Sequence, residues 1–356
     1  MRVSSNADTA VASHWRGHSL NVLLIWLALA LAPIVAIVVS LAVGRYAVSL
    51  EHVAGILLSP LTGADKTWTD TDATVVLIVR LPRALLSAVC GAGLAVAGAA
   101  LQGLFRNPLV APQILGVSSG AGFGGALSLL FGLSGLWLIG ASFAGAWVAL
   151  LAVLLLARVE GRTSLLMLVL AGLVVGALFS ALTSICVFLA DPEQRLPGIV
   201  FWLLGSFATA DGQRLLLATG AISIGAIVIV MLAWRIDVLS LGDEDARALG
   251  QPVDAIRWAV LAAVSLIVAG QVAVSGIIGW VGLVIPHMMR GIVGPDHRRL
   301  IPASILAGAA YLTLADTLAR SVSNAEIPLG ILTALVGAPV FAILLRRMRA
   351  KGGGDE

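Results

Sequence analysis

Charged residues are scarce in this chain of 356 residues: only 12% are Asp, Glu, Lys or Arg, whereas 59% are hydrophobic. Soluble globular proteins carry roughly 25% charged residues, so the chain lacks the polar surface that a soluble protein needs. Its formal net charge of +3 is too small to indicate a nucleic-acid partner. The composition therefore predicts an integral membrane protein.

Cysteine and lysine are also rare. Cys90 and Cys186 lie in apolar runs outside any CxxC pair, and we expect both to be small packing residues. Neither Lys66 nor Lys351 belongs to a GxxxxGK[ST] loop, so no ATP site is expected on this chain. No catalytic group, cofactor or metal site is predicted, because the histidines do not cluster at ligand spacing. The histidines are His14, His18, His52, His287 and His297.

Long apolar runs fill most of the sequence. The first, Leu20–Val43, exceeds the roughly 7–15 residues of a signal-peptide core and could cross a hydrocarbon layer of ~30 Å, which predicts a retained transmembrane helix. An all-α membrane protein of about ten transmembrane helices is expected. The other predicted spans are Leu81–Phe105, Pro112–Leu133, Leu136–Ala157, Ser164–Ala190, Leu215–Trp234, Ile256–Ser275, Gly279–Val293, Leu300–Ser321 and Pro328–Leu345.

Two stretches do not fit one helix each. Gly198–Thr209 is too short to span a bilayer and is predicted to be a surface or re-entrant helix. The apolar sequence Ala259–Met289 is too long, and its glycines and Pro286 predict a break into two helices. We expect a single membrane domain over residues 20–346, with tails over residues 1–19 and 347–356.

Basic residues are distributed unevenly between the connections, which predicts the orientation. With the N-terminus inside, the cytoplasmic side carries Arg2, Arg16, Arg106, Arg158, Arg162, Arg235, Arg247, Arg257, Arg290, Arg298, Arg299, Arg346, Arg347, Arg349 and Lys351. The outer side keeps only Arg45, Lys66, Arg80, Arg83, Arg195, Arg214 and Arg320. The positive-inside rule therefore places both termini in the cytoplasm.

The segment Arg80–Ala121 is the most informative part of the chain. Its sequence is RLPRALLSAVCGAGLAVAGAALQGLFRNPLVAPQILGVSSGA, in which two arginines flank a proline and a Gly/Ala-rich apolar helix follows. Small residues allow membrane helices to pack closely. The breaks at Asn107-Pro108 and Ala111-Pro112 are either interruptions at membrane depth, next to a cavity, or part of a plain cytoplasmic turn.

This segment resembles the signature region of the FecCD permeases, the membrane subunits of ATP-binding-cassette (ABC) importers for iron-siderophores, heme and cobalamin. Further blocks similar to the family follow in the same order, so the resemblance extends from about Arg80 to Leu345. They are FWLLGSFA at Phe201–Ala208, GIIGWVGLVIPHMMR at Gly276–Arg290, GPDHRRLIP at Gly294–Pro302, and Leu314–Phe341. The outer segment Arg45–Thr74 matches no family block.

The resemblance implies a transport subunit in a bacterial inner membrane that is not itself an enzyme. Its expected partners are a second copy of the chain, two cytoplasmic ATPase subunits that hold ATP and Mg, and an extracytoplasmic substrate-binding protein. An iron chelate leads among the implied cargoes, followed by heme and cobalamin. An ion-coupled secondary transporter is the alternative, and it is disfavoured because Asp316 is the only carboxylate well inside a predicted span.

Arg80, Arg83 and Arg320 fall at the outer ends of predicted helices. In the family that this chain resembles, arginines at these places receive acidic residues of the binding protein, which implies a docking role. The alternative is snorkelling to lipid headgroups. Asp316 lies four residues before Arg320, which predicts an intrahelical ion pair.

The polar stretch Ser240–Gly250 resembles the short helices, here residues 239–250, that insert into a cleft of the ATPase. A solvated connector helix is the alternative, and Gly250 is predicted to follow its C-terminus. The residues assigned to coupling are Gly242, Asp243, Glu244, Ala246, Arg247, Leu249 and Gly250.

The same resemblance assigns a cytoplasmic gate of the transport pathway. Asn107, Pro108 and Leu109 match family positions near that gate. Thr163 and Ser164 begin the fifth span, where they either approach the gate or cap the helix.

Overall fold

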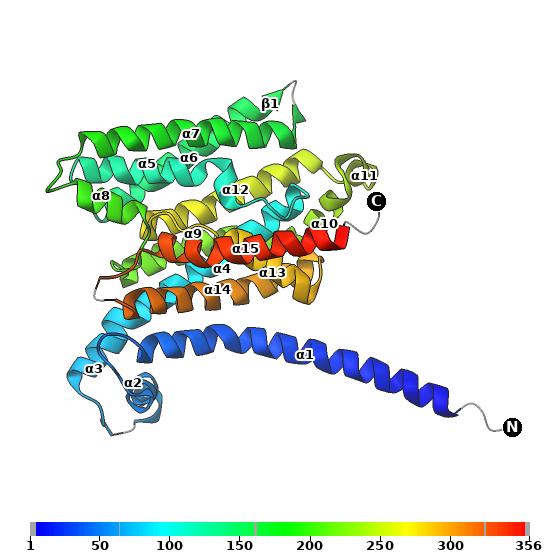
Figure 1. Cartoon of the computed structure of the whole chain (residues 1–356), viewed down its shortest axis with the longest axis horizontal. Coiled ribbons are helices and arrows are strands. Elements are labelled where there is room, and N and C mark those ends of the chain that lie inside the picture. Colours follow the sequence, from blue (N-terminus) through cyan, green and yellow to red (C-terminus); the bar gives the residue numbers. More distant parts are fainter. Residues whose placement is uncertain (1–4, 64, 160–161, 324, 353–356) are drawn as a thin grey trace.

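The computed structural model is a bundle of ten membrane-length or shorter apolar helices that run side by side (Figure 1). It describes residues 5–63, 65–159, 162–323 and 325–352. Among these residues, seven helices are long and apolar enough to cross a membrane and three shorter helices are also apolar. The ten are α1 (Ser5–Ala42), α4 (Leu81–Leu104), α5 (Val117–Leu130), α6 (Leu136–Ala157), α7 (Leu165–Leu189), α9 (Gly212–Met231), α12 (Val253–Ser275), α13 (Val281–Val293), α14 (His297–Ser321) and α15 (Leu329–Gly352).

The remaining elements gather at the two ends of the bundle. We call the left end in Figure 1 the α2 end; it holds α2 (Leu50–Thr62), α3 (Asp70–Thr74), a π-helical turn at Val75–Arg80 that leads into α4, and α8 (Leu196–Leu203). The opposite, α11 end holds a 3-10 helix (Pro112–Leu115), the hairpin of β1 (Arg158–Val159) and β2 (Arg162–Thr163), α10 (Ala233–Leu241) and α11 (Asp243–Ala248).

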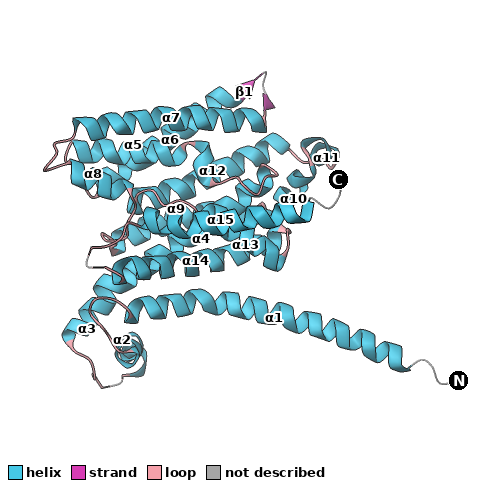
Figure 2. Cartoon of the chain, in the orientation of Figure 1, coloured by secondary structure: helices cyan, strands magenta, loops and turns pink. Residues whose placement is uncertain are grey.

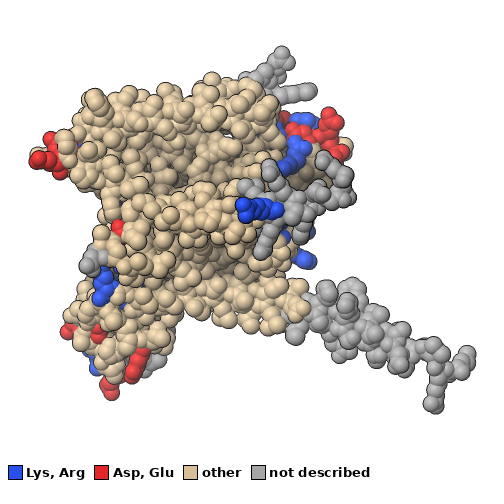
Figure 3. Space-filling view, viewed as in Figure 1, with Lys and Arg blue, Asp and Glu red and all other residues tan. Residues whose placement is uncertain are grey.

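Helix covers nearly all of the picture in Figure 2, and the strands form only the small hairpin. The space-filling view in Figure 3 shows charged side chains at the two ends of the bundle and a broad belt without them in between. A belt of this kind is what a bilayer core requires, since every exposed charge there is costly. The predicted all-α membrane architecture is thus confirmed.

The helices follow one another in space as α1, α14, α4, α9 and α12, and α5, α6 and α7 complete the far side. Glycine makes the centre of this stack possible. A Cβ on Gly91 of α4 would come 2.2 Å from the Gly308 carbonyl oxygen of α14, and one on Gly98 would come 1.7 Å from the Gly282 oxygen of α13. Only glycine allows the backbones to approach so closely, as the small-residue pattern predicted.

Both stretches that did not fit one helix have the predicted form. The long apolar sequence divides after Ser275, where Gly276 has a φ of 71°, and α13 resumes at Val281. The short stretch contains α8, which packs on α5 and α7 at the α2 end, and its Ile199 is buried with Cys186 and Ala126. α8 is therefore a short helix at the end of the bundle, and its place at the membrane surface or within the membrane stays a prediction.

The connection from Gly44 to Thr74 is more ordered than its sequence suggested. Ser49 caps α2 by accepting a hydrogen bond from the His52 N–H, and Thr69 forms a capping box with Asp72 at the start of α3. These helices enclose a small core of their own against the end of α1; its buried members are Leu41, Val48, Val53, Ile56 and Val76. The connection is a small helical cap over the α2 end.

Candidate functional site

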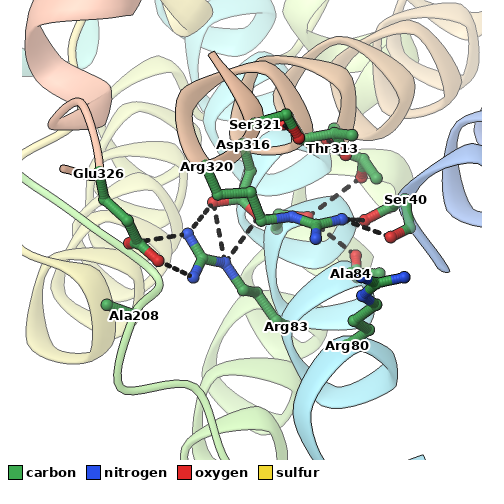
Figure 4. Close-up of polar contacts among 12 residues, drawn as sticks. Ser40, Arg80, Arg83, Ala84, Ala208, Thr313, Asp316, Arg320, Ser321 and Glu326 are labelled. Atoms are coloured by element: carbon green, nitrogen blue, oxygen red, sulfur yellow. Dashed lines mark hydrogen bonds and ion pairs between the residues drawn. The ribbon is translucent and has the colours of Figure 1, made fainter. Parts of the chain in front are cut away.

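A cluster of charged side chains lies buried at the α2 end (Figure 4). Arg83 of α4 donates from Nε and Nη2 to the Asp316 carboxylate of α14, with distances of 2.9 Å to each carboxylate oxygen. It also donates from Nη1 to Glu326 Oε1 at 2.8 Å and from Nη2 to Oε2 at 3.2 Å. One guanidinium thus joins α4, α14 and the connection that leads to α15.

Whereas Arg83 donates to carboxylates, Arg80 and Arg320 both donate hydrogen bonds to carbonyl groups at the C-terminal end of α1. Arg80 Nη1 donates to the Leu41 and Ala42 carbonyls at 2.6 and 3.1 Å, and Nη2 donates to the Tyr46 carbonyl. Arg320 Nη2 donates to the Ser40 carbonyl and, at 3.1 Å, to its hydroxyl. Cations next to the last carbonyls of a helix are favourable, since those groups have no partner within the helix.

The predicted pair between Asp316 and Arg320 is confirmed at 3.9 Å between Oδ2 and Nε. It is longer than the Arg83–Asp316 contact, so Arg83 is the main partner of this carboxylate. The side chain of Asp316 is 0% exposed. A buried carboxylate is tolerated only where cations and hydrogen bonds compensate for the lost water, and here two arginines do so.

The arginines predicted for docking are therefore buried and bonded within the chain. Snorkelling to headgroups is wrong for Arg80, Arg83 and Arg320, because each guanidinium bonds to protein groups instead. Docking stays a prediction. Glu326 was missed because it lies on a connection between helices, 243 residues from Arg83. The two arginines next to a proline indicate a cluster of positive charge at this place, but they do not indicate which carboxylate pairs with it.

At the α11 end, α11 has the predicted boundaries: Gly242 precedes it with a φ of 138°, and Gly250 follows it with a φ of 75°. Asp243 accepts from Arg257 at 2.8 Å and from Arg106 at 3.4 Å. These contacts fasten the start of α11 to α12 and to the turn after α4. The solvated-connector alternative fits only one side of α11, since Ala246 is buried.

The other side of α11 projects into solvent. Leu249 is 59% exposed, and Glu244, Asp245 and Arg247 are exposed with it. Figure 3 shows their charges as a mixed red and blue group at the right end. A single exposed leucine among charges is ordinary on a protein surface, so a partner at α11 stays a prediction.

The break after α4 is a turn at the helix end. α4 stops at Leu104, Arg106 adopts a φ of 52°, and the Asn107 side chain accepts from the Leu109 N–H at 2.9 Å. Asn107 is exposed and belongs to a turn at the end of α4; the depth of this turn in the membrane stays a prediction. The second break, at Pro112, begins the 3-10 helix that precedes α5.

A cavity of about 430 Å³ opens beside this turn. Arg106, Arg290, His287 and His297 line it, and no Asp or Glu is among its lining residues in the described part of the chain. Arg290 donates to Gln102 Oε1 at 3.2 Å on its wall. The remaining lining residues are Gln102, Gly103, Asn107, Pro108, Ser240 and Pro295.

The predicted gate residues are only partly brought together. Asn107 and Pro108 line the cavity, whereas Leu109 and Ser164 are not among its lining residues. Ser164 occupies the N-cap position of α7 without a side-chain capping bond, and the side chain of Thr163 lies outside the described residues. A gate role for these residues stays a prediction.

Comparison with known protein families shows to which family this chain belongs. The model of the FecCD transport family matches residues 31–347. The chain belongs to the FecCD transport family. Proteins of this family are transport permeases rather than catalytic enzymes, and this chain is accordingly a multi-pass permease subunit of an ABC importer.

Three similar proteins illustrate the assignment. The permease of a molybdate import system from Haemophilus influenzae is 43% identical over 92% of this chain and 96% of its own length. The permease of a cobalamin import system from Halobacterium salinarum is 42% identical over 78% of this chain and 74% of its own. A solved structure described as an inward-facing, metal-chelate type ABC transporter is 42% identical, with a TM-score of 0.81 over 90% of this chain and 98% of that one.

The family assignment excludes the secondary-transporter alternative. The structure agrees, since Asp316 is neutralised by Arg83 and Arg320 and is not free to bind a coupling ion.

Proposed function

We propose that this permease imports a metal-containing, negatively charged cargo, with molybdate as the first candidate and an iron chelate as the second. The observation that supports molybdate most strongly is the near full-length similarity to a permease named for molybdate import. The sequence alone favoured an iron chelate, with heme and cobalamin next. The named relative moves molybdate ahead of these.

The lining of the cavity supports a cargo of negative charge. Arg106 and His297 of its lining are already held by Asp243 and Asp237. Arg290, which donates to the Gln102 amide oxygen, is the lining cation that favours an oxyanion or carboxylate. Molybdate, ferric chelates and the propionates of heme share that chemistry. Cobalamin, whose single phosphodiester is balanced by the charge of its cobalt centre, carries no net negative charge and is the least suited of the implied cargoes.

Transport requires partners that this chain does not contain. We propose a homodimer with the pathway between its subunits, two cytoplasmic ATPases that bind ATP and Mg, and an extracytoplasmic binding protein. The α11 end faces the cytoplasm of a bacterial inner membrane, as the excess of arginine at that end favours. Closure of the ATPases on the Gly242–Gly250 segment shifts the population between outward and inward states of the pathway.

The first test is purification of the tagged chain from its native membrane in mild detergent, followed by mass spectrometry of its partners. We expect a P-loop ATPase at about one copy per permease. Reproducible isolation of the permease without any ATPase would contradict the proposal. A co-purifying extracytoplasmic protein then provides the reagent for cargo assignment.

The second test is ATP-dependent uptake by proteoliposomes that contain the purified complex and its binding protein. Molybdate, a ferric siderophore, hemin and cobalamin are compared at equal concentration. We expect uptake of molybdate and little uptake of cobalamin. Saturable cobalamin uptake without molybdate uptake would overturn the cargo assignment while leaving the importer assignment intact.

A further inference from the structure

The carboxylate of Glu326 covers the open side of Arg83. Asp316 holds the inner side through Nε and Nη2, whereas Glu326 is the partner of Nη1 and shares Nη2. The Glu326 side chain is 28% exposed, compared with 10% for Arg83 and 0% for Asp316. Glu326 is therefore the most exposed of these three side chains, and Figure 4 shows its carboxylate facing the Arg83 guanidinium.

The two carboxylates differ in how firmly the fold holds them. Asp316 lies in the middle of a helical turn of α14, against α4, and cannot move without disrupting both helices. Glu326 lies on the connection over residues 322–328, where Val322, Ser323 and Ala325 are exposed. Exposed connections open at lower free energy than packed helices, so Glu326 is the replaceable partner of Arg83.

We propose that Glu326 occupies, within this chain, the place of a partner's carboxylate, and that an acidic side chain of the extracytoplasmic binding protein displaces it from Arg83. This inference rests on the proposed function, because it requires such a partner at the α2 end. The displaced and the incoming groups are both carboxylates, so Arg83 keeps its hydrogen bonds throughout the exchange.

Charge balance favours an acidic partner at this place. Three arginines and two carboxylates form the cluster (Arg80, Arg83, Arg320, Asp316 and Glu326), which leaves one positive charge in excess. Withdrawal of Glu326 raises this excess by one more charge at the surface. A complementary carboxylate is then attracted to the exposed side of Arg83.

The exchange has two consequences for the transporter. Without a partner, Glu326 prevents Arg83 from being left with an unpaired side, which is costly in a buried site. With a partner, release of Glu326 removes the hydrogen bonds that join the connection over residues 322–328 to Arg83, while the start of α15 stays held by the Leu329 N–H, which donates to the Gly205 carbonyl at 2.8 Å.

The cover itself can be tested with phenylglyoxal, which modifies free guanidinium groups. The full transporter complex in nanodiscs is treated, and modification of Arg83 is measured by peptide mass spectrometry. In Glu326→Gln and Glu326→Ala we expect Arg83 to react about three- to tenfold faster than in the native protein. Glu193→Gln, an exposed glutamate on another connection at the same end, is the matched control. Equal rates in all four proteins would overturn the proposal.

The docking step is tested by adding the co-purified binding protein to the same nanodiscs. We expect Glu326→Gln to bind it about three- to tenfold more tightly, and Arg83→Gln to lose most of the affinity. Unchanged affinity in Glu326→Gln, together with loss in Arg83→Gln, would overturn the displacement but not the importer. Absence of any binding protein and ATPase from the native complex would instead overturn the proposed function.

Discussion

The arginine cluster at the α2 end and the exposed side of α11 at the other end treat their charged residues in opposite ways. At the α2 end, Arg80, Arg83 and Arg320 are buried, and every one is bonded to a carboxylate or a helix carbonyl of the same chain. At the α11 end, Glu244 and Arg247 are left in solvent. Buried charges that are satisfied internally hold helices together, whereas exposed charges remain available to a partner. The comparison sets a cluster that joins helices, in which Glu326 is the replaceable partner of Arg83, against a side of α11 that is open to contact.

The largest effect is expected for Asp316→Asn at the α2 end. Loss of this carboxylate leaves Arg83 and Arg320 buried with less compensation, and breaking a buried ion pair costs about 3–5 kcal/mol. We expect the free energy of unfolding in mixed micelles to fall by that amount. Asp70→Asn, which removes an exposed pair with Lys66, should change it by less than about 1 kcal/mol. Equal effects of the two variants would break the contrast between buried and exposed pairs.

A smaller loss is expected for Arg80→Gln, which removes the hydrogen bonds to the end of α1. Bonds to a charged group contribute about 1.5–3 kcal/mol, so we expect a loss of about 2–3 kcal/mol of unfolding free energy. A cysteine introduced at Ala42 should also react faster with a maleimide. Arg45→Gln is the control, since Arg45 makes one exposed hydrogen bond, to the Ser323 carbonyl. The prediction fails if both variants leave α1 equally protected.

Asp243→Asn tests the carboxylate that accepts from both Arg257 and Arg106 and so fastens the start of α11. Arg257 is 1% exposed and keeps Asp254 at 3.6 Å when Asp243 is neutralised. We therefore expect a loss of about 1–2 kcal/mol, accompanied by weaker ATPase activation. Asp245→Asn, on the exposed side of α11, should leave stability unchanged. A stability loss as large as that of Asp316→Asn would show that the two ends do not differ in this way.

The smallest effect on stability is expected for Leu249→Asp. Leu249 is exposed, so the free energy of unfolding should stay within about 0.5 kcal/mol. Recovery of the ATPase with the purified permease should nevertheless fall at least about tenfold, as for an apolar anchor of an interface. Leu50→Asp is the control, because Leu50 is equally exposed at the opposite end. Full recovery of the ATPase with the Leu249→Asp permease would show that Leu249 of α11 does not contribute to binding of the ATPase.

Most of the fold could be predicted from the sequence. The predicted span Leu136–Ala157 coincides with α6, and the predicted division between α12 and α13 lies at Gly276. Hydropathy and helix breaks are local properties, so they can be read along the chain. The helical cap formed by α2 and α3 was missed because its small core depends on contacts with the end of α1.

The candidate sites were predicted less completely. α11 was predicted correctly because its glycines, charges and exposed leucine are consecutive in sequence. For the α2 end, the sequence indicated which arginines lie there but not that α1 carbonyls hold two of them. Such partners come from another helix, and no local pattern encodes them.

The sequence by itself determined the membrane class, the approximate number of long apolar helices and the family, since apolar length and motif order require no knowledge of packing. Only the tertiary structure decided which charges neutralise one another. Arg83 and Glu326 lie 243 residues apart, and they meet because α4, α14 and α15 all begin or end at the α2 end. The partner of a buried charge is the group that helix packing places next to it, and this group can lie anywhere in the sequence.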